Sequence, residues 1–461
     1  MTNVKYTPEE PIAAIATALA PSALGIVRCS GRNCIELLSK IFSRPKALLA
    51  AKGNTIVYGW IVSAEKSALD EVLISVFRAP KSFTGEDMAE ISCHGGVHVV
   101  QSVFNLLLNS GFRRAERGEF TFRAYINGKA DLTKAEAVRE IIDSKTNESQ
   151  SRAAGRLAGN LYETVDSVKK HIIDTLAAIE VEIEYPEDEE TIADSFDSAE
   201  LEKARNDLAE LRDSWKSEKI YQDGARVVLC GRTNAGKSSL FNAMLKEDRA
   251  IVSDIEGTTR DFIESWIDFS GIPARLFDTA GLRKTDDAIE AVGVERTLDL
   301  SKEADLILYL VDSRSGMNED DIAFVQNHIS DSGNGTPLIL VWNKCDATDE
   351  QESPAFPLPQ VRISAKKGTG LGALSETVRD CLSSAGKSER NGTGLGSERQ
   401  KKSVEKALDC VNHALSLTEE YALDAVVQDL EDALDALGEV TGDVTPDDVL
   451  ESIFAHFCVG K

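Results

Sequence analysis

The stretch Gly231-Arg-Thr-Asn-Ala-Gly-Lys-Ser238 decides the fold of the middle of the chain. It matches the pattern G-x-x-x-x-G-K-S, in which glycines let backbone N–H groups close around phosphate oxygens. The apolar run 227–230 precedes it and the helical run 240–245 follows it, which is the strand–loop–helix context that a phosphate-binding loop requires. The stretch therefore predicts an α/β domain that binds a nucleoside triphosphate.

The phosphate-binding loop and two motifs that follow it in the sequence supply the catalytic parts of such a site. Within the loop, Lys237 would reach the β- and γ-phosphates and Ser238 would ligate Mg²⁺. Asp278 ends the apolar run 275–277 and has the chemistry of the acidic residue that holds Mg²⁺ through water, while the N–H of Gly281 would contact the γ-phosphate. Residues 257–261 lie between the two motifs, where a GTPase keeps its first switch.

The base is predicted to be guanine. In Asn343-Lys-Cys-Asp346 the last carboxylate can accept hydrogen bonds from both N1–H and the 2-amino group of guanine, whereas adenine would leave it unpaired. Ser364-Ala-Lys366 matches the last of the motifs that form the loops around the guanine base. The residues predicted to contact GTP are Asn234, Ala235, Gly236, Lys237, Ser238, Ser239, Asp278, Thr279, Ala280, Gly281, Asn343, Lys344, Asp346, Ser364 and Ala365.

The hydrolytic machinery departs from the common pattern. Leu282 follows Asp-Thr-Ala-Gly, so no glutamine stands there to orient the attacking water. The amide oxygen of Asn234, three residues before the loop lysine, could hold a monovalent cation beside the phosphates. Arg260 and Arg283 are either arginine fingers or residues of the switch surface, and the second interpretation is the preferred one.

The composition describes a long, acidic, multidomain chain. The 461 residues carry 51 Lys and Arg against 77 Asp and Glu, a net charge of −26, which excludes a generic polycationic binder of nucleic acid or membranes but not a local basic patch. No apolar run reaches the length of a membrane span, and the start of the chain has no signal pattern. The eight scattered cysteines indicate reduced thiols, so we expect a cytoplasmic protein.

The periodicity of apolar residues divides the chain into three kinds of domain. We predict an α+β N-terminal domain, an all-α helical domain that is split in sequence, and an inserted α/β P-loop GTPase (Ras-like) domain with a parallel sheet. The two halves of the helical domain should pack on each other, since neither has a sheet to cover. The predicted ranges are 1–125 for the N-terminal domain, 126–222 and 384–461 for the two helical parts, and 223–383 for the G domain.

Two local predictions concern the second helical part. The polar, glycine-rich stretch 384–398 is expected to be a flexible connection. The last helix is expected to begin with Thr445 as its N-cap and Pro446 at its first position.

Taken together, these motifs and those of the two ends of the chain resemble the tRNA-modifying GTPase family called MnmE or TrmE, over nearly the full length. The G-domain motifs alone would indicate only a GTPase, so the N-terminal and C-terminal motifs carry the specific part of the resemblance. The matching stretches outside the G domain are Leu24–Gly31, Ser82–Asp87, His94–Gly96, Arg117–Thr121, Asn127–Leu132 and Ile453–Lys461, the last with Cys-x-Gly-Lys at its end.

The resemblance implies a homodimer formed through N-terminal domains that bind a folate one-carbon carrier, 5-formyl- or methylene-tetrahydrofolate. It also implies a partner of the MnmG (GidA) family that uses FAD and NADH. Together the two proteins would install an aminomethyl or carboxymethylaminomethyl group at C5 of the wobble uridine of certain tRNAs. GTP, Mg²⁺ and K⁺ would serve the G domain.

Site residues follow from the resemblance position by position. Those matching folate contacts are Arg28, Glu90, Lys129 and Lys461. Those matching the K⁺ site are Asn234, Ser253, Ile255 and Thr258, and those matching Mg²⁺ ligands are Ser238 and Thr259. Glu290 matches the residue that orients the hydrolytic water.

Several alternatives stay open at the level of sequence. Cys458 is either a group in the chemistry or an inert terminal thiol, and Glu86 and Asp87 are expected to order a turn. His94 and His98 are four residues apart, but Gly95-Gly96 argues against the regular helix that a metal pair would need. The alternative function is a regulatory GTPase, for ribosome assembly or signalling, that has no modification chemistry.

Overall fold

The computed structural model describes residues 10–63, 65, 67–184, 198–246, 264–278, 304–330, 336–347, 356–383, 393–418 and 423–461. These residues form two compact units, each described by itself. The first joins the described residues of Met1–Arg139 to Leu437–Lys461, and the second is Glu140–Ala436. The last helix and the C-terminal tail therefore belong to the same unit as the N-terminal domain.

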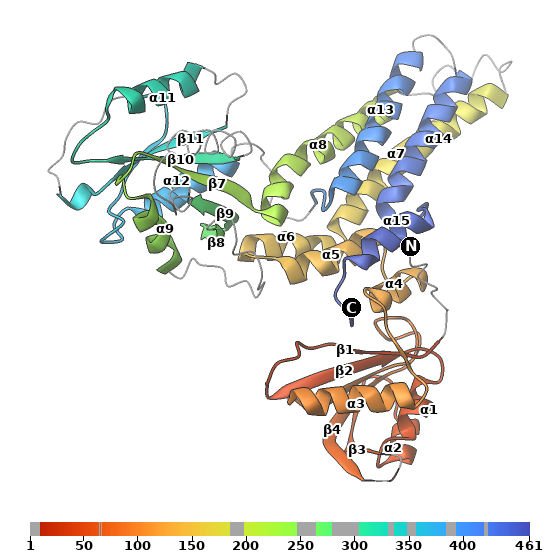
Figure 1. Cartoon of the computed structure of the whole chain (residues 1–461). Helices are drawn as coiled ribbons and strands as arrows, with labels where there is room; N and C mark the ends of the chain where they lie inside the picture. The colour runs from red at the N-terminus through yellow and green to blue at the C-terminus, as the bar shows by residue number, and fades with distance from the viewer. Residues whose placement is uncertain are drawn as a thin grey trace. The chain divides into compact units, whose positions relative to one another are not determined.

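A sheet forms the centre of the first unit (Figure 1). It has six strands in the order β3-β4-β5-β2-β1-β6. Its strand pairs are antiparallel except β1 and β6, which pair in parallel. Strands β1 to β5 lie on short β-like runs between turns, as expected for an α+β domain, whereas the two-residue strand β6 was not predicted. They are β1 (Ile12–Ile15), β2 (Leu24–Ser30), β3 (Thr55–Val62), β4 (Ala68–Phe77), β5 (Met88–His94) and β6 (Arg113–Arg114).

Helices cover one face of this sheet. In α3 (Val97–Asn109), the buried residues Val100, Val103, Phe104 and Leu107 recur at helical spacing, so one stripe packs on the sheet. The opposite face keeps several apolar side chains exposed, as described below. The other helices of this part are α1 (Cys34–Ser39), α2 (Pro45–Leu49) and α4 (Glu119–Ile126).

The end of the chain packs against α4 through aromatic side chains. The rings of Phe122 and Phe454 meet edge to face at a centroid distance of 5.2 Å, and Phe454 also packs beside Phe457. The helix α15 (Asp447–Ala455) has Pro446 as its N-cap, one residue later than expected. The prediction that Thr445 caps it was wrong, since the Thr445 hydroxyl has no hydrogen-bond partner among the described residues.

Long helices make up one part of the second unit. Helix α8 and helix α13 pack on each other although the G domain separates them in sequence (Figure 1). The prediction of a helical domain in two packed halves is thereby confirmed. The helices are α6 (Asn147–Ala158), α7 (Asn160–Glu184), α8 (Ser198–Asp223) and α13 (Glu398–Thr418), while α5 (Leu132–Asp143) and α14 (Leu423–Thr441) cross the division between the units.

The segment before α13 is packed, not flexible, in its described part. Leu395 is fully buried, and its backbone N–H donates to Ser214 Oγ of α8 at 3.3 Å. The backbone N–H of Gly396 donates to the buried Gln400 at 2.7 Å. The prediction of a flexible connection over 384–398 was therefore wrong for 393–398, and 384–392 lie outside the described residues.

The G domain is built on a second six-stranded sheet, with the order β12-β11-β10-β7-β9-β8. Its central strands are parallel and buried, as their continuous apolar runs predicted. The edge strand β8 pairs antiparallel with β9 and is the exception to the parallel pairing of the other described strands. The strands are β7 (Ala225–Gly231), β8 (Glu264–Phe269), β9 (Ile272–Asp278), β10 (Leu306–Asp312), β11 (Leu338–Asn343) and β12 (Gln360–Arg362).

Three helices are described in the G domain: α9 (Lys237–Lys246), α11 (Glu319–Ser330) and α12 (Leu371–Ser383). Leu371, Leu374 and Val378 of α12 pack into the core of the sheet, together with Leu240 and Met244 of α9. No described helix of the chain combines the length and the apolar character that a membrane span requires.

Candidate functional site

The phosphate-binding loop connects β7 to α9, as its sequence predicted. Gly231 has φ +126°, and a Cβ atom there would lie 2.3 Å from the carbonyl oxygen of Leu310. Gly236 has φ +101°, and its Cβ would lie 2.1 Å from Nδ2 of Asn343. Both positions require glycine, because any side chain would force the loop away from its neighbours.

Asn343 ties the guanine motifs to the phosphate loop. Its side chain is almost fully buried, and its Nδ2 donates to the carbonyl of Ala235 at 2.9 Å. Its Oδ1 accepts from the backbone N–H of Ala365 at 3.1 Å, in the loop after β12. One amide thus joins three predicted GTP-binding segments that are far apart in sequence.

Lysines brace the same loop. Lys344 Nζ donates to the carbonyl of Asn234 at 2.6 Å and pairs with Asp312 Oδ2 at 2.8 Å. Lys237 Nζ donates to the carbonyl groups of Gly231 and Arg232 within the loop. This is the lysine that is predicted to contact the phosphates of GTP. Sequence reasoning did not identify Asp312, whose pKa is lowered mainly by its hydrogen bond with Arg314 and also by Lys344.

The residue that is predicted to select guanine is held in place by the last motif. The hydroxyl of Ser364, which is fully buried, donates to Asp346 Oδ1 at 2.7 Å. This hydrogen bond is the main cause that lowers the pKa of Asp346, so the carboxylate stays ionised. Ser364 thereby orients the acceptor that the guanine edge needs.

A number of predicted residues lie outside the described part of the chain. Asp278 is described only as the last residue of β9. The remaining switch and catalytic residues are Ser253, Ile255, Thr258, Thr259, Arg260, Thr279, Ala280, Gly281, Arg283 and Glu290, and all of them fall in the ranges that the structure does not describe.

The predicted folate residues come together in the first unit. Arg28 of β2 donates to Glu90 Oε1 of β5 from Nε at 2.9 Å and from Nη2 at 2.6 Å. Its third nitrogen donates to the carbonyl of Gly460 at 3.1 Å, so the C-terminal tail lies directly on these two strands. Burial, together with the charge of Arg28, lowers the pKa of Lys461.

Aromatic rings and a loop complete this region. The Arg28 guanidinium lies 5.8 Å from the ring centre of Phe83 and 5.7 Å from that of Phe120. The exposed Lys129 lies beside Gly85 in the loop that carries Phe83. Of the four residues that resemble folate contacts, Arg28, Glu90 and Lys461 therefore lie together, and Lys129 contacts the neighbouring loop.

Backbone hydrogen bonds fix the tail. The N–H of Phe120 donates to the carbonyl of Lys461 at 3.2 Å, and Val459 forms a β-bridge with Arg117. Gly460 has φ +95°, and a Cβ there would approach the carbonyl of Ile15 to 2.9 Å. Only glycine allows the tail to pass this close to β1, which explains the glycine of Cys-x-Gly-Lys. Cys458 is exposed beside it.

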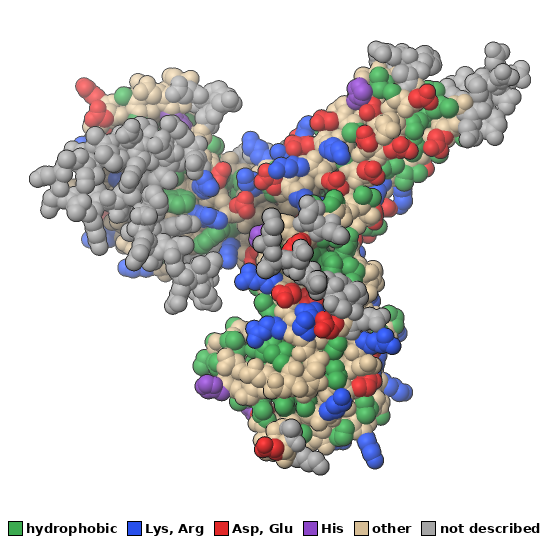
Figure 2. Space-filling model, turned by 45° about the vertical axis from the view of Figure 1, so that its right-hand side comes forward, with side chains coloured by type: hydrophobic (Ala, Val, Ile, Leu, Met, Phe, Trp, Pro, Cys, Tyr) green, Lys and Arg blue, Asp and Glu red, His purple; other side chains and the backbone are tan. Residues whose placement is uncertain are grey.

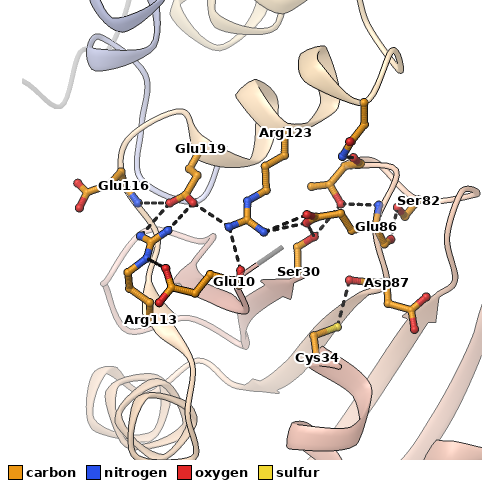
Figure 3. A network of polar contacts seen from close by, with 12 residues as sticks. Glu10, Ser30, Cys34, Ser82, Glu86, Asp87, Arg113, Glu116, Glu119 and Arg123 are labelled. Atoms are coloured by element: carbon orange, nitrogen blue, oxygen red, sulfur yellow. Dashed lines mark hydrogen bonds and ion pairs between the residues drawn. The ribbon is translucent and has the colours of Figure 1, made fainter. Parts of the chain in front are cut away.

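A charged network that sequence reasoning missed holds α4 against the sheet (Figure 3). Arg123 is fully buried and donates to Glu86 Oε2 and to Glu119 Oε1, both at 2.9 Å. Arg113 also donates to Glu119 at 2.6 Å. Burial alone would raise the pKa of Glu119, but the hydrogen bond from Arg113 is the largest of the effects that lower it.

This network links the candidate folate site to the loop between β4 and β5, which carries Glu86. The hydroxyl of Ser30 donates to Glu86 Oε2 at 2.8 Å, two residues along β2 from Arg28. Asp87 accepts a hydrogen bond from the N–H of Ala79, so it orders a turn as expected, whereas Glu86 joins the buried network. The spacing of Glu119 and Arg123, four residues apart on one helix face, was the signal available in the sequence.

The first unit also contains a histidine–aspartate pair. His94 Nδ1 and Asp70 Oδ1 lie 2.7 Å apart, and the pair raises the pKa of His94. No group of three or more metal-ligating His, Cys, Asp or Glu side chains occurs among the described residues.

Comparisons with known proteins agree over the whole chain. A family model described as "GTP-binding protein TrmE N-terminus" matches residues 11–129, and one described as "MnmE helical domain" matches residues 132–458. A protein of Treponema denticola named "tRNA modification GTPase MnmE" is 51% identical over 99% of both chains. Proteins of the same name from Treponema pallidum and Borrelia recurrentis are 41% and 39% identical, again over 99% of both chains. The chain therefore belongs to the MnmE (TrmE) family and is a GTP-hydrolysing enzyme of that family.

Proposed function

We propose that this GTPase acts in tRNA modification together with an FAD- and NADH-using partner of the MnmG (GidA) family. The product is an aminomethyl or carboxymethylaminomethyl group at C5 of the wobble uridine of certain tRNAs, built from a folate one-carbon unit. The observation that carries this proposal is the gathering of Arg28, Glu90 and the tail residues Gly460 and Lys461 on one sheet face. A GTPase with no modification chemistry would have no use for such a site.

The chemistry of this region suits a reduced folate. Arg28, Lys129 and Lys461 offer positive charge to the carboxylates of the glutamate part, and guanidinium groups bind carboxylates strongly. Phe83 and Phe120 supply ring faces beside Arg28 for an aromatic ligand. When bound, 5-formyl- or methylene-tetrahydrofolate supplies the one-carbon unit, while these side chains bind and orient it.

We also propose that two copies associate through the part of the first sheet, over β3 and β4, that the tail and α4 leave exposed. On β3, Ile56 and Tyr58 are 65% and 49% exposed, and the register places Tyr58 beside Leu73 of β4, which is 46% exposed. Leu24 of β2 is 62% exposed. An apolar sheet face of this kind is typical of a protein–protein interface, and Arg28 and Glu90 lie on the same face.

In the G domain, we propose that Ser238 and Thr259 hold Mg²⁺ and that Asn234 helps to hold K⁺ with groups of Ser253, Ile255 and Thr258. A fixed cation beside the phosphates would stabilise the negative charge that develops in the transition state, in place of an arginine finger. Glu290 would position the water. Of these residues, Asn234 lies in the loop with φ +66°, braced by Lys344 through its carbonyl.

We expect these reactions in the cytoplasm, a reducing compartment, and all eight cysteines are free thiols. Cys458, exposed next to the candidate folate site, is available to the chemistry.

The test is direct binding of 5-formyl-tetrahydrofolate to the full chain by isothermal titration calorimetry. Removing Val459–Lys461 should weaken binding at least tenfold, because Lys461 and the carbonyl of Gly460 that fixes Arg28 are lost together. GTP hydrolysis of the same variant should stay close to that of the complete chain. No folate binding by the complete chain would favour the regulatory GTPase instead. Folate binding that the truncation leaves unchanged would show that the tail does not contribute to the site.

A further inference from the structure

The second unit contains a basic cavity that none of the sites above uses. It measures about 880 Å³ and is lined by side chains of α8, α13, β7 and β9. Its basic residues are Arg212, Lys216, Lys219, Arg226, Arg275 and Lys401. Its acidic residues are Asp213, Asp223, Asp305 and Glu405. The lining therefore carries an excess of positive charge in a chain whose net charge is −26.

Local contacts already neutralise the acidic residues in part. Arg212 pairs with the neighbouring Asp213 at 2.8 Å, and Lys401 pairs with Glu405 at 3.1 Å. Asp305 accepts the backbone N–H of Arg226 at 2.7 Å. By contrast, neither Lys216 nor Lys219 forms an ion pair with another residue of the described ranges, and both are exposed.

The cations form one stripe on α8. Arg212, Lys216 and Lys219 are separated by four and then three residues, so they lie on one helix face and are about 6 Å and then about 4.5 Å apart along the axis. A row of charges at this spacing suits a ligand whose negative charges are also arranged in a row. Figure 2 shows many acidic side chains over the long helices, which would repel such a ligand elsewhere.

An aromatic ring in the lining favours nucleic acid over an acidic protein as the ligand of this cavity. Trp215 lines the same cavity next to Lys216 and is only partly buried. Aromatic side chains placed among cations are typical of sites that bind single-stranded RNA, in which bases stack on rings while lysine and arginine contact phosphates.

We propose that this cavity binds a single-stranded segment of tRNA, with phosphates on the stripe Arg212, Lys216 and Lys219 and a base stacked on Trp215. The inference rests on the proposed function, which supplies tRNA as the substrate. It adds a surface for that substrate on the helical part beside the G-domain sheet.

The experiment measures binding of fluorescently labelled tRNA to the full chain by anisotropy, over a series of KCl concentrations. Lys216→Gln combined with Lys219→Gln should weaken binding about tenfold or more at low salt. It should also reduce the slope of log affinity against log salt by roughly 1 to 2, because two phosphate contacts are lost. The matched control combines Lys203→Gln of α8 and Lys406→Gln of α13, two exposed lysines that do not line the cavity.

A second variant separates stacking from charge. Trp215→Ala should weaken binding by about tenfold with little change in the salt slope, and Trp215→Phe should restore most of the affinity. GTP hydrolysis in the absence of tRNA should be unchanged in every variant.

The outcomes separate the two proposals. If the unmutated chain binds tRNA and the double lysine variant binds with the affinity and salt slope of its control, the cavity is not the RNA site, and an acidic protein becomes the better occupant. If the unmutated chain does not bind tRNA at all, the proposed function itself fails and this inference fails with it.

Discussion

Single residues explain most of the nucleotide site. Asn343 contacts the phosphate loop and the loop after β12, and Gly236 is packed so closely against it that no side chain fits. These roles could be predicted from sequence because the motifs have fixed spacing and each demands one residue type. Asp312 could not, since its contact with Lys344 depends on two parallel strands that end at the same edge of the sheet.

The hydrogen bond from Ser364 to Asp346 leads to a prediction about pH. Because this bond lowers the pKa of Asp346, the carboxylate remains an acceptor for guanine as the pH falls. In Ser364→Ala the pKa should rise back toward its usual range, so GTP affinity should begin to fall at a higher pH than in the unmutated chain. At neutral pH, Ser364→Ala should weaken GTP binding by about 1 kcal/mol, or roughly fivefold in affinity.

Titration with a fluorescent GTP analogue between pH 4 and 8 would measure this shift. Ser315→Ala, an exposed serine of the same domain, should leave the profile unchanged. Identical acid limbs in Ser364→Ala and Ser315→Ala would show that Ser364 does not control the carboxylate.

At the scale of elements, the sequence predicted the strands, the long helices and the packing of the two helical halves, but not the order of the strands. The apolar run 227–230 located β7, because a short continuous apolar run is typical of a buried parallel strand. The order of the strands and the antiparallel edge β8 depend on long-range pairing, which local periodicity does not encode. Residues 393–398 resembled a flexible linker because glycine is also used where the backbone must pass close to another group.

Gly394 and Gly396 lie close to a cluster of buried charged side chains. Glu218 of α8 is fully buried and accepts hydrogen bonds from Arg152 and Arg156 of α6. Arg156 also donates to the carbonyl of Gly394 at 3.2 Å, and a Cβ at Gly394 would lie 2.7 Å from Glu218. The cluster thus joins the helix that enters the G domain to the segment that returns from it.

We predict that Glu218→Gln strongly destabilises the helical part, by roughly 3–5 kcal/mol, because the charges of Arg152 and Arg156 then lose a buried partner. The change should move urea unfolding, followed by far-ultraviolet circular dichroism, to lower urea concentration. Glu202→Gln on the exposed side of the same helix should change stability by no more than about 0.5 kcal/mol. Equal shifts in the two variants would show that the cluster contributes no stability.

At the scale of the whole molecule, the C-terminal tail meets the N-terminal domain. The C-terminal tail lies on β1, β2 and α4 of the N-terminal domain, although more than 400 residues separate Arg28 from Gly460. Sequence alone indicated this only through the resemblance to a family, because no local pattern connects a terminal Cys-x-Gly-Lys to a distant arginine. The folate interpretation therefore depends on the structure for its geometry and on the family for its ligand.

The open sheet face supports a prediction about association. The unmutated chain should be a dimer at micromolar concentration, and Ile56→Glu should shift it to monomer, because a buried unpaired carboxylate is costly. Leu49→Glu, at an exposed leucine of α2, is the matched control and should remain a dimer. Sedimentation velocity distinguishes the two states, and a dimeric Ile56→Glu variant or a monomeric unmutated chain would contradict the assignment.

The central claim is that this GTPase takes part in wobble-uridine modification through its N-terminal site and tail. Mass spectrometry of tRNA nucleosides, from cells with the gene deleted and then restored, tests it most directly. Deletion should remove the aminomethyl or carboxymethylaminomethyl group at C5 of the wobble uridine. The full chain should restore it, and the chain lacking Val459–Lys461 should not, although its GTP hydrolysis persists. Wobble nucleosides that are unchanged by the deletion, or fully restored by the truncated chain, would contradict the account.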